Sequence, residues 1–142
     1  MKKRSVVRSV AVLAAASSVI GGAWATAPQA DAATSAKGTV QCASGAIVAG
    51  VWVVAKNGGS GFARFTRSPG TPSYARFEYT LSRGGSYLVN VGCGLKSNGR
   101  DWKTNNTSTV YLSGTRTFLC YDVKVYAPKV PSNYAYQKCL AS

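Results

Sequence analysis

The sequence of 142 residues contains no histidine and only four acidic residues. A Ser-His-Asp triad and a Cys-His pair are therefore impossible, because both require an imidazole. Beyond residue 32 the carboxylates are Glu78, Asp101 and Asp122. Two carboxylates facing each other across a cleft could still hydrolyse a glycoside, but Glu78 lies on an expected strand beside Arg76, where a solvated ion pair is the simpler interpretation. We expect a protein that is not an enzyme and that holds no cofactor.

The chain also lacks a hydrophobic run long enough to cross a bilayer. Four basic residues lie within positions 2–8, and the Ala-rich apolar stretch 9–20 that follows is shorter than the roughly 20 residues a spanning helix needs. This pattern is typical of a secretory signal peptide. We assign residues 1–32 to it, with cleavage after Ala32 and a second choice after Ala25. The sequence thus predicts a secreted, extracellular protein whose mature form, residues 33–142, is one domain without a membrane span.

Basic residues dominate the charge, with 17 Lys and Arg giving a formal net charge of +13. The expected signal holds four of the 17 basic residues and one of the four acidic ones, so the mature domain carries about +10. A charge of this size concentrates anionic polymers near the surface. The expected partners are an anionic polymer or glycan, or a secreted protein, with nucleic acid bound only as a non-specific polyanion.

Four cysteines follow the signal, and an even number in an exported chain indicates disulfides. Zinc is the rival interpretation, and the missing histidine and the missing Cys-x-x-Cys pair disfavour it. Three connectivities are possible. We favour Cys42 with Cys93, because these residues end two expected strands, and Cys120 with Cys139, because this bridge would pin an irregular tail.

The hydrophobic residues alternate with a period of two, and turn residues recur every eight to twelve positions, which indicates an all-β fold. In residues 73–81, for example, Ala75 and Phe77 share one face while Arg76 and Glu78 share the other. We expect an antiparallel β-sandwich or small barrel of about seven short strands. The expected strands are one ending at Cys42 and the segments 46–56, 62–67, 73–81, 87–93, 108–112 and 115–122.

Three details of this expectation can be tested by a structure. The segment 46–56 is apolar on both sides, so we expect a central strand that is covered on both faces. The polar stretch 94–106 is expected to be a loop. The last two strands should form a hairpin about Ser113-Gly114.

Two groups of residues are candidates for binding. If the strands 62–67 and 73–81 pair, one aromatic and basic patch would comprise Phe62, Arg64, Tyr74 and Arg76. The second group lies in the expected loop and comprises Lys96, Arg100, Trp102 and Lys103. Aromatic faces stack on sugars or bases, and arginine binds anions through its planar fork. The simpler alternatives are a solvated face or a contact between sheets for the first group, and a tryptophan that folds back onto the core for the second.

Two partial resemblances accompany these patterns. The segments 119–123 (LCYDV), 127–128 (AP) and 136–140 (YQKCL) resemble the closing part of tendamistat-type α-amylase inhibitors, which implies a secreted all-β sandwich with two sequential disulfides. The inhibitory Trp-Arg-Tyr triplet of that family has no counterpart here, so no functional residue is carried across. The segments 50–53 (GVWV) and 85–89 (GSYLV) resemble transthyretin-like and carboxypeptidase-regulatory sandwiches, which implies a fold and no activity.

These observations predict a secreted, basic, non-catalytic binding protein that recognises an anionic cell-envelope or extracellular polymer or glycan. The alternative is a proteinaceous inhibitor or toxin-like ligand of a secreted protein such as a glycosidase.

Overall fold

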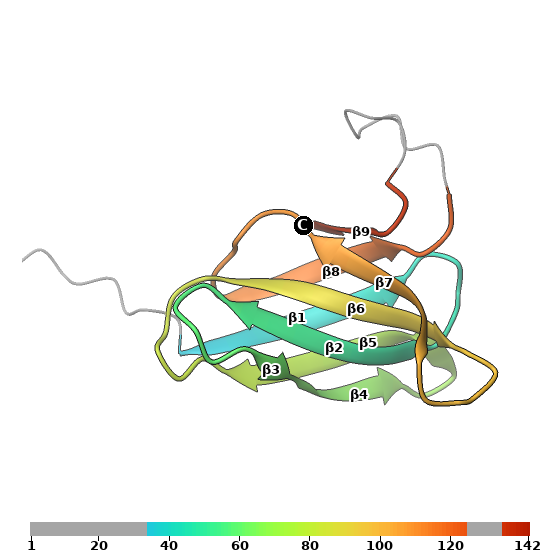
Figure 1. Ribbon diagram of the computed structural model, residues 1–142, viewed down its shortest axis with the longest axis horizontal. Coiled ribbons are helices and arrows are strands. Elements are labelled where there is room, and N and C mark those ends of the chain that lie inside the picture. Colours follow the sequence, from blue (N-terminus) through green and yellow to red (C-terminus); the bar gives the residue numbers. More distant parts are fainter. Residues whose placement is uncertain (1–33, 125–134) are drawn as a thin grey trace, which may run out of the picture.

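The computed structural model describes residues 34–124 and 135–142, and these residues contain nine β-strands and no helix (Figure 1). The expected signal peptide, residues 1–32, lies outside the described residues. No described segment forms a helix with the length and apolar character needed to span a membrane. The strands are β1 (Ser35–Cys42), β2 (Val48–Ala55), β3 (Gly61–Phe62), β4 (Arg64–Ser68), β5 (Thr71–Thr80), β6 (Tyr87–Leu95), β7 (Trp102–Ser108), β8 (Thr115–Tyr121) and β9 (Lys138–Ala141).

All nine strands belong to one sheet, in the order β3-β2-β6-β7-β9-β8-β1-β5-β4. The two end strands β3 and β4 follow each other in the chain, and between them the Ala63 amide donates to the Val51 carbonyl at 2.9 Å. The sheet therefore curls into a nearly closed barrel, with β2, β6 and β7 in front of β1 and β5 in Figure 1. The expected all-β fold is confirmed: of the two expected architectures, a sandwich or a small barrel, the structure has the barrel, with nine strands where about seven were expected. The pairs β1–β8 and β7–β9 are parallel, and the other neighbours are antiparallel.

Alternating residues fill the barrel interior, as the sequence period predicts. On β5, Ala75 and Phe77 are buried while Arg76 and Glu78 are exposed. The largest fully buried side chains include Tyr87 and Phe118, whose rings pack against each other at 6.5 Å between centroids. In the rest of the core the most frequent residue is valine, contributed by β1, β2 and β6.

Both expected disulfides are present. Cys42–Cys93 joins β1 to β6, with its Cα atoms 5.9 Å apart, and so connects opposite parts of the barrel. Cys120–Cys139 joins two residues that are paired across the neighbouring strands β8 and β9. The first bridge closes a loop of 51 residues and the second a loop of 19.

The expected loop 94–106 is wrong, because β6 continues to Leu95 and β7 already begins at Trp102. Asparagine is depleted in strands, so its density in this segment suggests a loop. In the fold, however, Asn106 is fully buried and its Nδ2 donates to the Val91 carbonyl at 3.1 Å. A specific interior hydrogen bond thus overrides the local preference.

The expected strand 108–112 and its hairpin with 115–122 are also wrong. Strand β9 lies between β7 and β8, so these two strands do not pair. Of the residues 109–112, only Leu112 has a bridge partner, which is Tyr87. The tail expected to be irregular therefore contributes a strand to the middle of the sheet, because residues 138–141 complete the ladder between β7 and β8.

Tyr87 fixes one end of the interior. Its side chain has no exposed surface, and its single O–H is shared between the carbonyls of Gly114, at 2.7 Å, and Lys37, at 3.3 Å. Burial raises the pKa of Tyr87 to about 12, against smaller opposing effects from Arg116 and the bond to Lys37. The phenol therefore stays neutral while it connects β6 to β1.

Candidate functional site

An aromatic surface covers the outside of β3, β2, β6 and β7. We call this surface the aromatic face and define it by Trp52, Phe62 and Trp102. Phe62 lies directly opposite Trp52 in the β2–β3 pair, and its side chain is 67% exposed. A phenyl ring this exposed adds little to the hydrophobic core, and together with the two indoles it forms an apolar patch of the kind that marks interaction sites.

Two paired glycines make room for Trp102. Gly50 on β2 lies opposite Gly92 on β6. A Cβ atom at Gly92 would lie 2.1 Å from Cδ2 of Trp102, and one at Gly50 would lie 2.7 Å from Cζ2 of the same indole. Because several ring atoms lie close to both glycine positions, the indole lies flat on the sheet. Its second face is turned away from the barrel.

The three rings are not parallel to one another. Phe62 is 4.8 Å from Trp52 and 6.2 Å from Trp102 between ring centroids, with interplanar angles of 84° and 85°. The phenyl ring is therefore nearly perpendicular to both indoles, an edge-to-face arrangement that aromatic pairs prefer. The aromatic face therefore consists of two indoles and a phenyl ring that is nearly perpendicular to both of them.

Uncharged polar groups lie beside these rings. Asn90 on β6 is paired with Trp52 on one side and with Thr107 on the other, and Asn105 is paired with Gly92. The Oδ1 atom of Asn90 is covered and makes no hydrogen bond within the described part of the chain. The face thus combines stacking surfaces with amide and hydroxyl groups that have hydrogen-bonding capacity.

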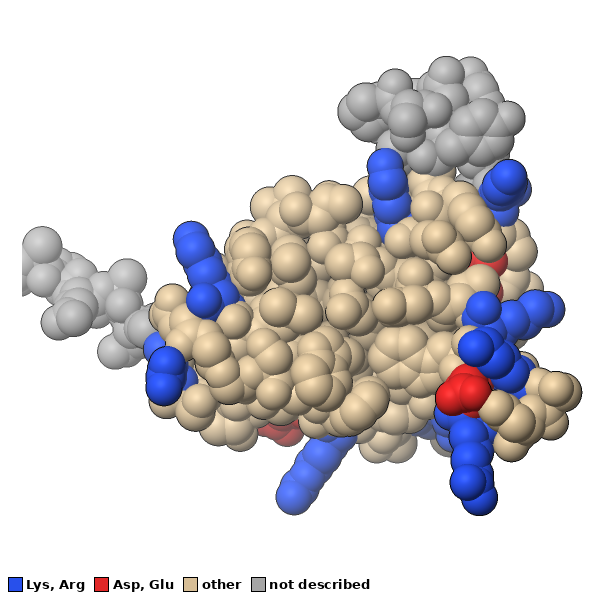
Figure 2. Space-filling model, viewed as in Figure 1, with Lys and Arg blue, Asp and Glu red and all other residues tan. Residues whose placement is uncertain are grey.

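Among the described residues, charged side chains lie toward the two ends of this face and not in its middle. Figure 2 shows the surface over β2 and β6 free of Lys, Arg, Asp and Glu, with basic side chains at both ends of the barrel. At the β6–β7 end the exposed cations are Lys96, Arg100 and Lys103. A ligand on the aromatic face would therefore meet a neutral centre and a basic margin.

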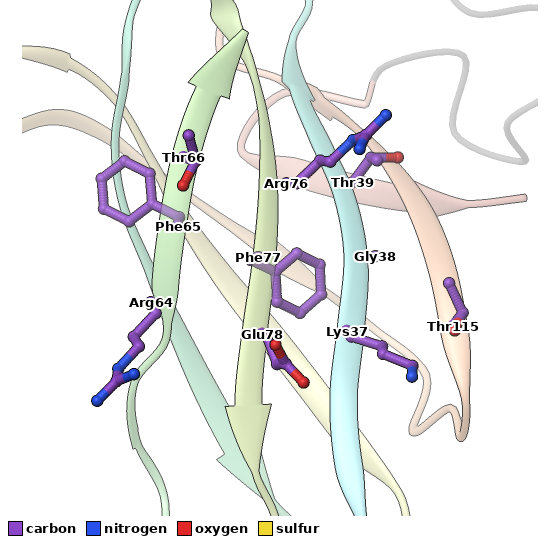
Figure 3. Close-up of a pocket in the computed structure, with 10 residues that line it drawn as sticks. All are labelled: Lys37, Gly38, Thr39, Arg64, Phe65, Thr66, Arg76, Phe77, Glu78 and Thr115. Carbon is purple, nitrogen blue, oxygen red and sulfur yellow. The ribbon is translucent and has the colours of Figure 1, made fainter.

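The outside of β4, β5, β1 and β8 has a different chemistry. We call it the charged face and define it by Lys37, Arg64, Arg76 and Glu78. Glu78 is paired with Arg64 on β4 and with Lys37 on β1, and in Figure 3 it lies between them. Thr39, Thr66 and Thr115 lie beside these charged residues. A surface hollow of about 460 Å³ is lined by Lys37, Gly38, Thr39, Arg64, Phe65, Thr66, Arg76, Phe77, Glu78 and Thr115.

The first predicted patch is divided between the two faces. The strands β4 and β5 do pair, as that prediction required, and Arg64, Tyr74 and Arg76 all point outward on the charged face. Phe62 instead belongs to β3, which pairs with β2. The cause is Ala63, whose buried side chain and bond to β2 divide the expected strand 62–67 in two.

The second predicted group is also divided. Lys96 and Arg100 lie in the turn between β6 and β7, whereas Trp102 and Lys103 begin β7. Trp102 does not cap the interior of the barrel, because it lies on the outer surface over the two glycines. The structure thus brings Trp102 together with Phe62, a pair that the sequence placed in separate groups.

The sequence interpretation missed Trp52 as a member of the site. Segment 46–56 was expected to be covered on both faces, but Trp52 and Val54 on the outer side are only half-buried. An apolar strand cannot show by periodicity which side is covered. The signal that identifies the outer side is the pair Gly50 and Gly92, since small residues in paired strand positions leave space for a large ring.

The three carboxylates of the described chain have separate environments. Glu78 lies on the charged face, Asp101 accepts a bond from Asn98 in a turn, and Asp122 is buried and accepts from the Ser44 amide at 2.9 Å. The sulfurs of Cys42 and Cys93 lie within 4.8 Å of the Asp122 carboxylate. Those sulfurs are bonded to each other, so this group offers no thiolate to a metal.

Comparisons with protein-family models, with curated proteins and with solved structures give no significant match to this chain.

Proposed function

We propose that this chain is a secreted, non-catalytic binding protein that recognises an extracellular glycan polymer, and that sugar rings stack on the aromatic face. The observation that carries the proposal is the indole of Trp102, which lies flat across Gly50 and Gly92 beside the exposed ring of Phe62. The two glycines leave the sheet without side chains where this ring lies, and the ring keeps one broad side toward the surroundings.

The chemistry of the face fits a sugar polymer. The apolar side of a sugar ring packs against aromatic rings by dispersion and by removal of water. Asn105 and Thr107 supply amide and hydroxyl groups next to the rings, which suit the hydroxyls of a sugar. The absence of charge over β2 and β6 suits sugar rings rather than a highly charged ligand at this place.

Secretion is supported by a separate observation. The two disulfides are consistent with an oxidising compartment, where such bonds form and persist. The expected signal peptide adds a sequence argument. The mature domain, with a formal net charge of about +10, would favour encounter with anionic cell-envelope or extracellular polymers.

The test is affinity electrophoresis of the purified protein in gels that contain one soluble polysaccharide each, with neutral and acidic polymers in parallel. We expect retardation by at least one polysaccharide. Trp102→Ala should weaken this binding on the order of 10-fold, because the loss of one stacking contact costs about 1–3 kcal/mol. Both tryptophans of the described residues lie on the aromatic face, so intrinsic fluorescence reports the same binding event directly.

Tyr111→Ala is the matched control, because Tyr111 is an exposed aromatic residue outside the aromatic face and is 41% exposed. It should bind like the parent protein. If Trp102→Ala and Tyr111→Ala bind equally well, the aromatic face is not the site. Stoichiometric inhibition of a secreted glycosidase, together with no retardation by any polysaccharide, would replace the glycan proposal with the inhibitor interpretation.

A further inference from the structure

The aromatic face and the charged face adjoin where β3 is followed by β4. A surface hollow at this edge is lined by Phe62, Arg64, Glu78, Tyr79 and Thr80. The hollow on the charged face shares Arg64 and Glu78 with it. An extended ligand can therefore pass from the rings of the aromatic face to the charged face without leaving the surface.

The strand register continues this route across the charged face. Arg64 on β4, Glu78 on β5, Lys37 on β1 and Thr115 on β8 form one row of paired residues. With about 4.8 Å between neighbouring strands, this row is roughly 14 Å long. The row runs across the strands.

A second row lies next to it and supplies hydroxyl groups and one more cation. It comprises Thr66, Arg76, Thr39 and Thr117, again paired across β4, β5, β1 and β8. The hydroxyl of Thr39 donates to that of Thr117 at 3.1 Å. The two rows together hold three cations and one carboxylate.

The charges around Glu78 determine which ligands the charged face can attract. An anionic group of a ligand would gain from both cations and from Arg76, and it would be repelled by Glu78. Arginine binds a carboxylate or sulfate through a planar fork, and the neighbouring threonines can donate to the same oxygens. These residues fit a ligand that carries spaced negative groups.

We propose that the glycan is an acidic polysaccharide. Its chain crosses the strands, with a sugar ring stacked on the aromatic face and its carboxylate groups on the charged face near Arg64, Lys37 and Arg76. This inference rests on the proposed function, because it extends the same site and names the class of its ligand. It also assigns Glu78 a role, which is to limit the affinity of the charged face for anions.

The experiment compares two forms of one polymer by tryptophan fluorescence titration. Polygalacturonate carries a carboxylate on each sugar, and its methyl ester has the same chain without the charges. We expect the acid form to bind about 5- to 10-fold more tightly in 50 mM salt, since each exposed ion pair contributes about 1.4- to 5-fold. The difference should largely disappear in 500 mM salt, because salt screens exposed charges.

Substitutions on the charged face separate its contribution from that of the rings. Arg64→Gln and Lys37→Gln should each weaken binding of the acid form about 2- to 5-fold and leave binding of the methyl ester unchanged. Glu78→Gln should strengthen binding of the acid form by a similar factor. Lys124→Gln removes an exposed cation away from both hollows, so it should change neither value.

The outcomes distinguish this inference from the function on which it rests. The inference of an acidic polysaccharide is wrong if both polymer forms bind equally at low salt, or if Glu78→Gln weakens binding of the acid form. The glycan proposal stands in either case. If neither these polymers nor any other polysaccharide binds, the proposed function is wrong. Inorganic polyphosphate carries charge without sugar rings, and equally tight binding of it that survives Trp102→Ala would contradict the use of the aromatic face by the acidic ligand.

Discussion

The aromatic face and the charged face are two outer surfaces of the same barrel, and they enclose the same valine-rich interior. On one, Trp102 lies on a glycine pair and the middle carries no charge. On the other, Glu78 lies between Lys37 and Arg64 among threonines. The inward residues of both faces are apolar, whereas the outward residues of the two faces differ in their chemistry. The comparison teaches that the alternation of β-strands lets one set of residues specify the fold and the other set specify the ligand.

Loss of the disulfide that cross-links the two faces is predicted to have the largest effect on stability. Cys42→Ala with Cys93→Ala removes the bridge between β1 and β6, which closes a loop of 51 residues. The chain-entropy relation gives a loss of about 4 kcal/mol in the free energy of unfolding. Urea denaturation of the double variant measures this loss.

Removal of the other bridge is the control for that prediction. Cys120→Ala with Cys139→Ala opens a loop of 19 residues within neighbouring strands, and the expected loss is about 3 kcal/mol. A larger loss from this variant than from the first would contradict the view that Cys42–Cys93 is the main connection between the two faces.

Tyr87 provides a second connection between the faces, and this one depends on pH. Its pKa is about 12 in the folded protein and 10.0 in the unfolded chain. Because the folded value is raised, the stabilisation is complete below pH 10 and is lost as the pH rises toward 12, by up to about 2–3 kcal/mol. Tyr87→Phe should remove this dependence, and urea midpoints between pH 9 and pH 12 compare the two proteins. If the urea midpoints of both proteins fall equally with pH, another group is responsible for the pH dependence.

Gly92→Ala alters the aromatic face alone. The new Cβ would lie 2.1 Å from the Trp102 ring, so the indole must leave its place. We expect a loss of about 1–3 kcal/mol in stability, as for other overpacked sites, and a red shift of the tryptophan emission. Gly50→Ala is the graded control, because its closest approach is 2.7 Å and the ring has less to move. An unshifted emission spectrum in Gly92→Ala would contradict the flat placement of Trp102.

Thr117→Val gives the smallest expected effect and alters the charged face alone. It removes an exposed hydroxyl that accepts from Thr39 and keeps the shape of the side chain. We expect a change in stability of less than about 1 kcal/mol and unchanged binding of a neutral polysaccharide. A clear loss of neutral binding would mean that the two faces do not act separately.

Much of the barrel could be predicted from the sequence because its signals are local. The alternation around Phe77 can be read from residues that are close in the chain. The disulfides could be predicted because four cysteines allow only three pairings. The place of β9 could not be predicted, because the four residues 138–141 carry no pattern of their own and pair with strands from elsewhere. The strand character of Asn106 was hidden for a related reason, since its hydrogen bond goes to the distant residue Val91.

The candidate site was only partly predictable. Sequence analysis selected Phe62 and Trp102 by residue type, but it could not place them side by side, because they belong to β3 and β7, on either side of β2 and β6. It also grouped Phe62 with Arg76, on the assumption that alternate residues of the strand 62–67 share one face. The bond from Ala63 to β2 interrupts that strand and separates the two residues. The alternation of side chains along one strand can be read from the local sequence. The neighbours of an edge strand depend instead on how the whole sheet closes.

Among the nine described strands, β9 comes last in the chain, yet it lies between β7 and β8. Until residues 138–141 emerge from the ribosome, those two strands have open edges and the sheet has a gap in its middle. The sheet cannot be completed before this segment is present, and pairings between distant segments slow folding. The segment that closes the sheet between β7 and β8 is therefore also the one that is synthesised after both of them.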